Sequence, residues 1–152
     1  MMHNWFLCKV SYEKILENGM QKKVTEPYLV DALSFTEAEA RIIEEMSPFI
    51  TGEFTVSAVG RERLTEVFFN KGERYYKVKI NFITLDERSG VEKKTPAKML
   101  VEAENIKEAI SVFEEKMRGT LSDYVIVSVS ETAIMDVFQY TYENEESEVN
   151  NG

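Results

Sequence analysis

The chain spells nearly the same helix twice. The segment "SFTEAEARIIEEM" begins at Ser34, and "NIKEAISVFEEKM" begins 71 positions later at Asn105. Ser34 and Asn105 are favourable N-cap residues, and Glu37 and Glu108 follow three residues on, as in a capping box. Apolar residues in both segments recur at helical spacing. Each segment is therefore predicted to form a helix of about three turns that buries one face.

Strand patterns recur at almost the same spacing. "FLCKVSY" (6–12) alternates apolar and polar residues, and "YKVKINF" (76–82) does the same. Such alternation predicts a strand with one buried face. A turn signal follows each strand, Asn18-Gly19 in the first copy and a loop ending in Gly90 in the second. The other matching pairs are "YLVDA" with "MLVEA", "EFTVSAV" with "YVIVSVS", and "LTEVFF" with "IMDVFQY".

The strand after each helix must be aligned between the copies before its buried face can be predicted. We align Phe54 and Val56 with Val125 and Val127. On this alignment Tyr124 and Ile126 add apolar residues to the opposite face. The strand of the second copy is therefore expected to be covered on both faces.

Duplication of a β-β-α-β-β unit predicts an α+β fold. The repeats span about 5–69 and 75–140, and together they are expected to form a single globular domain over residues 1–140. A sheet with one short helix buries only one of its faces, so we expect the two copies to pack with pseudo-twofold symmetry. The expected architecture is a mostly antiparallel sheet of up to eight strands with two helices.

Composition limits the class of protein. The net charge is −9, and residues 141–152 contain several glutamates and no basic residue, so this tail is expected to be disordered. No apolar run approaches the roughly 20 residues of a membrane span, and no membrane partner is predicted. A single cysteine cannot form an internal disulfide, which favours a cytoplasmic location.

The sequence contains none of the common catalytic, phosphate-binding or metal-binding motifs. The one histidine, His3, is expected to be solvated near a frayed N-terminus. The one cysteine, Cys8, falls on the apolar face of the first strand and is expected in the core. We therefore predict no enzyme, no catalytic residue, no metal and no cofactor.

One basic strip suggests a binding function. Lys77 and Lys79 alternate along a strand, Lys93 and Lys94 lie across the hairpin, and Tyr75 borders the same region. Lysines beside aromatic rings can hold single-stranded nucleic acid by phosphate contact and base stacking. Exposed lysines also protect sheet edges from aggregation, and this alternative is favoured by the sequence alone.

Two further functional hypotheses come from the duplicated fold. The first is a non-enzymatic interaction protein that binds an unknown protein partner or a second copy of itself. The other is a small-molecule binder with a pocket between the repeats, lined by Trp5, Tyr12, Phe68 and Phe82 together with Tyr75. The interaction protein is the preferred hypothesis, because no residue pattern specifies a ligand.

Three segments carry a resemblance to a known family. They are "NWFLCKVSYEK", "EPYLVDALSFTEAEARI" and "VFFNKGERYYKVKINF". Together they resemble the uncharacterised family called domain of unknown function 4494, over nearly the whole chain up to about Tyr140. The resemblance implies a cytoplasmic protein linked to phages or mobile elements. It implies no catalytic or binding role for any residue.

Overall fold

The computed structural model describes residues 3–140, and the predicted acidic tail over 141–152 lies outside these described residues. The chain forms β-β-α-β-β twice in succession. The first repeat contains β1 (Trp5–Ile15), β2 (Gln21–Asp31), α1 (Phe35–Met46), β3 (Phe54–Glu62) and β4 (Glu66–Phe68). The second contains β5 (Arg74–Leu85), β6 (Glu92–Ala103), α2 (Ile106–Met117), β7 (Asp123–Glu131) and β8 (Val137–Phe138). The predicted duplication and the α+β class are confirmed.

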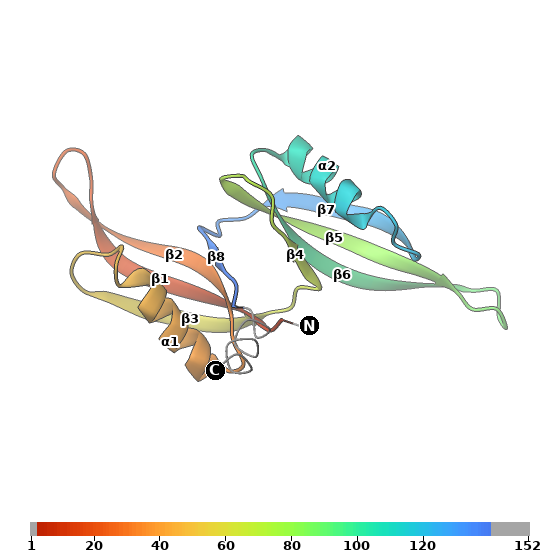
Figure 1. Ribbon diagram of the computed structural model, residues 1–152, viewed down its shortest axis with the longest axis horizontal. Helices are drawn as coiled ribbons and strands as arrows, with labels where there is room; N and C mark the ends of the chain where they lie inside the picture. The colour runs from red at the N-terminus through yellow and green to blue at the C-terminus, as the bar shows by residue number, and fades with distance from the viewer. Residues whose placement is uncertain (1–2, 141–152) are drawn as a thin grey trace, which may run out of the picture. The chain divides into compact units, whose positions relative to one another are not determined.

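The strands form two four-stranded mixed sheets, in the orders β3-β1-β2-β8 and β4-β6-β5-β7. Three antiparallel strands of each sheet come from one repeat, and the short fourth strand comes from the other repeat. Figure 1 shows the blue β8 beside the orange β2. Both fourth strands pair in parallel, β8 with β2 and β4 with β6.

This exchange of fourth strands changes the boundaries of the structural units. Among the described residues, one compact unit contains residues 3–62 and 136–140, and the other contains Arg63–Met135. We call them unit 1 and unit 2. The repeats predicted at about 5–69 and 75–140 therefore differ from the units by one strand each.

Chain direction explains why β4 leaves its own repeat. β3 ends at Glu62, which pairs with Trp5, and Trp5 pairs on its other side with Asp31, the last residue of β2. β3 and β2 run in the same direction because both are antiparallel to β1. After β3 the chain therefore leaves the sheet at the same end as the last residue of β2, and it is heading away from the sheet. A short linker cannot turn back to pair in parallel with β2.

The two cores are equivalent position by position. The helix of each unit covers one face of its own sheet, and the buried residues beneath it match along the two repeats. In unit 1 they are Phe6, Cys8, Val10, Tyr28, Val30, Ala32, Ala38, Ile42 and Met46. In unit 2 they are Tyr76, Val78, Ile80, Met99, Val101, Ala103, Ala109, Phe113 and Met117. This correspondence explains why the helix sequence is written twice.

The strand after each helix, β3 or β7, contains a β-bulge, and the two strands align differently from the prediction. The register shifts between Lys9 and Val10 in unit 1, and at the equivalent place in unit 2. A bulge adds one residue to the strand and breaks the two-residue alternation. The core of unit 2 is covered by Tyr124, Ile126 and Val129, not by Val125 and Val127. The predicted alignment was wrong by one position, and Val125 and Val127 point outward with 51% and 59% of their surface exposed.

Both predicted helix caps are present. The Ser34 side chain accepts a hydrogen bond from the Glu37 amide at 3.1 Å. Asn105 Oδ1 accepts one from the Glu108 amide at 2.8 Å. The Glu37 carboxylate lies beside Arg41 at 2.8 Å, an i,i+4 ion pair within α1.

Candidate functional site

The basic residues predicted to hold nucleic acid lie in β5 and β6. Directly paired residues of antiparallel strands share one face of the sheet. Lys79 pairs with Lys98 and Ile83 pairs with Lys94. Since Lys77 alternates with Lys79, these lysines share the face opposite the α2-covered core. We call Lys77, Lys79, Lys94 and Lys98 the lysine face.

The structure places two predicted contact residues differently. Lys93 pairs with Thr84, so it projects from the other side of the sheet, the side that carries the core. Tyr75 lies on the same face as Lys77, but only 4% of it is exposed, and its hydroxyl lies 3.4 Å from Glu102 Oε2. A base could not stack on a ring that is buried in this way.

The lysine face brings cations and hydroxyl groups together. Lys79 and Lys98 stand directly opposite each other. β7 contributes Ser128 opposite Lys79 and Ser130 opposite Lys77. Lys77 and Lys98 each already interact with another group.

The edge strand β7 borders the lysine face. It is nine residues long, and it pairs on one side only, with β5. The outward Val125 and Val127 stand at the positions that Thr55 and Ser57 occupy in β3, 70 residues earlier. The outward face of the edge strand is thus apolar at these two positions in unit 2 and polar in unit 1.

The aromatic residues predicted to line a pocket are distributed over both units. Trp5 and Tyr12 belong to β1 of unit 1 and point to opposite faces of that strand. Tyr12 packs against the core and donates a hydrogen bond to Glu26 Oε1 at 2.7 Å. Phe68 and Phe82 both pack against the core of unit 2. Each of these side chains other than Trp5 is therefore part of a core cluster.

A buried acid in unit 1 was missed by the sequence reading. Asp31 is fully buried, and its Oδ2 lies 2.5 Å from Nδ1 of His3. No hydrogen-bond donor among residues 3–140 reaches its Oδ1. The His3 ring also lies beside Trp5, with ring centroids 5.5 Å apart, and its Nε2 is 3.2 Å from Gln139. The expectation that His3 is solvated was wrong, because the paired carboxylate holds it.

The same region ties the exchanged C-terminal segment to α1. Arg41 donates to the Asp31 carbonyl at 2.6 Å, and its guanidinium lies 3.9 Å from the centre of the Tyr140 ring. The Tyr140 hydroxyl donates to Glu45 at 2.6 Å. Burial, followed by this hydrogen bond, raises the pKa of Tyr140. We call His3, Asp31, Arg41, Glu45 and Tyr140 the clasp.

Unit 2 has an analogous arrangement with different residues. Asn70, which follows β4, occupies the position of Tyr140. Its amide donates to Glu102 Oε1 at 3.0 Å, and its side chain donates to Glu108 at 3.3 Å. In unit 2 Glu102 holds the exchanged segment directly, whereas in unit 1 Asp31 acts through His3, which lies beside Gln139. The role of this acid is therefore best explained as structural.

One known family spans both repeats of this fold. A family model described as Domain of unknown function (DUF4494) matches residues 4–140. The chain belongs to the DUF4494 family. No curated protein and no solved structure matches the DUF4494 chain.

Metal-ligand clusters and membrane-spanning helices are absent from the described part of this DUF4494 protein, residues 3–140. No three His, Cys, Asp or Glu side chains in that range converge as metal ligands would. Neither α1 nor α2 is long and apolar enough to cross a membrane. Cys8 is fully buried, and burial together with the nearby Glu39 raises the pKa of its thiol to about 11. This thiol is therefore protonated and shielded from solvent at neutral pH.

One sequence signal could have revealed the clasp of the DUF4494 protein. Asp31 interrupts the apolar run "YLVDA", and Glu102 interrupts "MLVEA" at the matching position. An acid between apolar residues of a buried strand requires a partner. The pattern thus indicates that a partner exists. It does not identify His3, which lies 28 residues away in sequence.

Proposed function

We propose that this DUF4494 protein is a non-enzymatic interaction protein that pairs with a second copy of itself through β7. The observation that supports this proposal is the open edge of β7 with its exposed Val125 and Val127. An edge strand presents unpaired N–H and C=O groups that can bind another strand. A cytoplasmic location and a role in a mobile element are parts of the proposal that rest on the single buried thiol and the family resemblance.

The composition of β7 supports pairing. Natural edge strands are often protected by proline, by lysine or other charged side chains, or by a β-bulge. β7 reads DYVIVSVSE and contains no proline or lysine; its charges, Asp123 and Glu131, lie at its two ends, and it carries one bulge, at Val127. β3, the corresponding edge of unit 1, contains Gly60 and Arg61 and has polar residues at the outward positions. The apolar edge therefore belongs to unit 2 alone.

The β7 sequence is self-complementary in one antiparallel register. If Ile126 pairs with its own copy, Val125 of each chain faces Val127 of the other, and Asp123 faces Val129. A register centred on Val127 would instead place Asp123 against Glu131. Like charges at opposed positions are unfavourable, whereas β-branched pairs are favourable. The register centred on Ile126 is therefore the one we propose.

Sedimentation velocity of the full chain tests self-association. The sedimentation coefficient should rise with concentration between about 1 and about 100 µM, a range that detects micromolar dissociation constants. The Val127→Lys substitution should leave a folded monomer, because lysine on an edge blocks strand addition. Ser57→Lys at the matching bulge position of β3 is the control and should still dimerise. A wild-type chain that stays monomeric throughout, or a Ser57→Lys chain that also fails to dimerise, contradicts the proposal.

The lysine face favours a second candidate, binding of single-stranded nucleic acid. Retention of an oligonucleotide should fall steeply with salt, with a slope of about 0.7 per phosphate contact. Lys79→Ala combined with Lys98→Ala should weaken it. Lys14→Ala combined with Lys22→Ala removes another directly opposed lysine pair, at the tip of the first hairpin, and is the matched control. Equal loss in both double variants would indicate that only total charge matters.

A further inference from the structure

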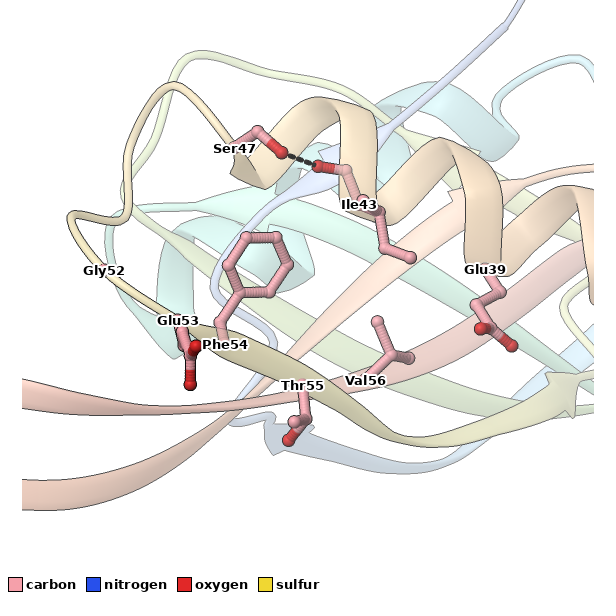
Figure 2. A pocket seen from close by; sticks show the side chains of 8 residues that line it. All are labelled: Glu39, Ile43, Ser47, Gly52, Glu53, Phe54, Thr55 and Val56. Carbon is pink, nitrogen blue, oxygen red and sulfur yellow. Dashed lines mark hydrogen bonds between the residues drawn. The ribbon is translucent and has the colours of Figure 1, made fainter.

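Unit 1 has a groove between α1 and β3. Its volume is about 420 Å³. Figure 2 shows Ile43 of α1 and Val56 of β3 pointing toward each other, with the Phe54 ring beside them. Glu39 lies at one end of the groove, whereas the Glu53 side chain projects from the strand on the side away from α1. The groove is thus an apolar slot with the Glu39 carboxylate at one end.

The charges of this groove are unbalanced. No Lys, Arg or His side chain is among the residues that line it. Neither Glu39 nor Glu53 hydrogen-bonds or forms an ion pair with any group of residues 3–140. The Ser47 hydroxyl is used internally, because it donates to the Ile43 carbonyl at 2.6 Å. The groove is therefore complementary to a side chain that is apolar along its stem and cationic at its end.

The groove lies along an open strand edge. β3 pairs on one side only, with β1, and its residues 54–56 belong both to the edge and to the groove wall. A strand added to this edge would alternate its side chains between the two faces of the sheet. Side chains on the α1 face would enter the groove. Main-chain pairing and a side-chain slot are the two features of peptide recognition by strand addition.

The matching region of unit 2 has a different composition. Ile110 replaces Glu39, Glu114 replaces Ile43, and Arg118 replaces Ser47. Arg118 is paired with Glu115 at 2.8 Å. The combination of an apolar Ile43 with an acid at position 39 is therefore specific to unit 1.

We propose that the groove between α1 and β3 binds an extended peptide segment of a partner protein that carries a lysine or arginine among apolar residues. The peptide pairs with the free edge of β3. The methylene stem of its basic side chain packs on Ile43, Phe54 and Val56, and its charged end reaches Glu39. This site is independent of the β7 edge in unit 2.

A peptide titration monitored by NMR tests this site on the full chain. The probe is the blocked peptide Val-Thr-Lys-Thr-Val-Thr, in which Lys and the two Val residues share one face. We expect amide shifts at Ile43 and along residues 52–56, and binding that weakens as salt is added. The same peptide with Glu in place of Lys should not produce these shifts.

Variants of the groove distinguish its charge from its shape. Glu39→Gln combined with Glu53→Gln should weaken binding about five- to tenfold, the effect of losing one or two exposed ion pairs. Ile43→Lys should abolish binding, because it places a cation in the slot at a position exposed enough to tolerate the change. Glu44→Gln alters an α1 glutamate outside the groove and is the control.

Three outcomes would overturn the proposal. The first is the absence of any shift at about 1 mM peptide, the weakest affinity that would still be specific here. The second is a set of shifts along β7 in place of β3. The third is equal binding by the wild-type chain and by the Glu39→Gln, Glu53→Gln double variant.

Discussion

Because the fourth strands are exchanged, a substitution in β8 should destabilise unit 1 and one in β4 should destabilise unit 2. The repeat boundaries alone would predict the opposite. Phe138 belongs to the second repeat, but it packs against the core of unit 1 and stacks with Tyr28 at a centroid distance of 6.0 Å. Phe68 belongs to the first repeat, but it packs against the core of unit 2 beside Phe113 at 6.2 Å. Phe138→Ala should therefore destabilise unit 1, and Phe68→Ala should destabilise unit 2.

The magnitude follows from burial. Replacing a fully buried phenylalanine by alanine costs about 3–5 kcal/mol of unfolding free energy. Phe138 is half-buried, so about half of that cost applies, and loss of the Tyr28 stack is included in it. We expect about 2 kcal/mol. For a urea m-value of about 1–2 kcal/mol/M, the unfolding midpoint should fall by about 1–2 M.

Hydrogen exchange measured by peptide mass spectrometry assigns each effect to a unit. Phe138→Ala should speed exchange of the slowest amides in β1 and β2 more than in β5 and β6. Phe68→Ala should do the opposite. The fluorescence of Trp5 gives a second readout of unit 1, because the chain has one tryptophan and it is 3% exposed in β1.

The opposite pattern would refute the exchange of strands. If Phe138→Ala loosened β5 and β6 while β1 and β2 kept their protection, each repeat would hold its own fourth strand. Equal loosening of all four strands by both variants would also contradict the prediction, because neither residue would then act on one unit.

Three further predictions concern single residues. His3→Ala leaves the buried Asp31 carboxylate without its partner and should lower the unfolding free energy by about 1–3 kcal/mol; an unchanged urea midpoint would contradict this. Gly72→Ala places a Cβ about 2.6 Å from the β6 backbone and should cost about 1–3 kcal/mol, whereas Gly60→Ala, with nothing within 4 Å, should be nearly neutral in the same urea assay. Folding raises the pKa of Tyr28 from 10.0 to about 12, mainly by burial. Its contribution to stability is therefore complete below pH 10 and is lost as the pH rises toward 12, so Tyr28→Phe should flatten the fall of the urea midpoint in that window.

The candidate site was predicted in part. Alternation placed Lys77 and Lys79 on one outer face; the register of β5 and β6 puts the predicted Lys94 on the same face and adds Lys98. Lys93 could not be assigned to a face, because hairpin register depends on the length and geometry of the loop. The outward position of Val127 could not be predicted either, since a bulge leaves no clear mark in a single strand sequence.

Local patterns in the sequence determined the elements, the helix caps, the duplication and nearly all of the core. These features depend on the two-residue and 3.6-residue periods and on residues three apart, which a linear chain displays directly. Tertiary structure alone decided which sheet each fourth strand joins and which partner holds Asp31. β4 and β8 are three and two residues long, too short to show a period, and their partners are fixed by chain direction and distant contacts.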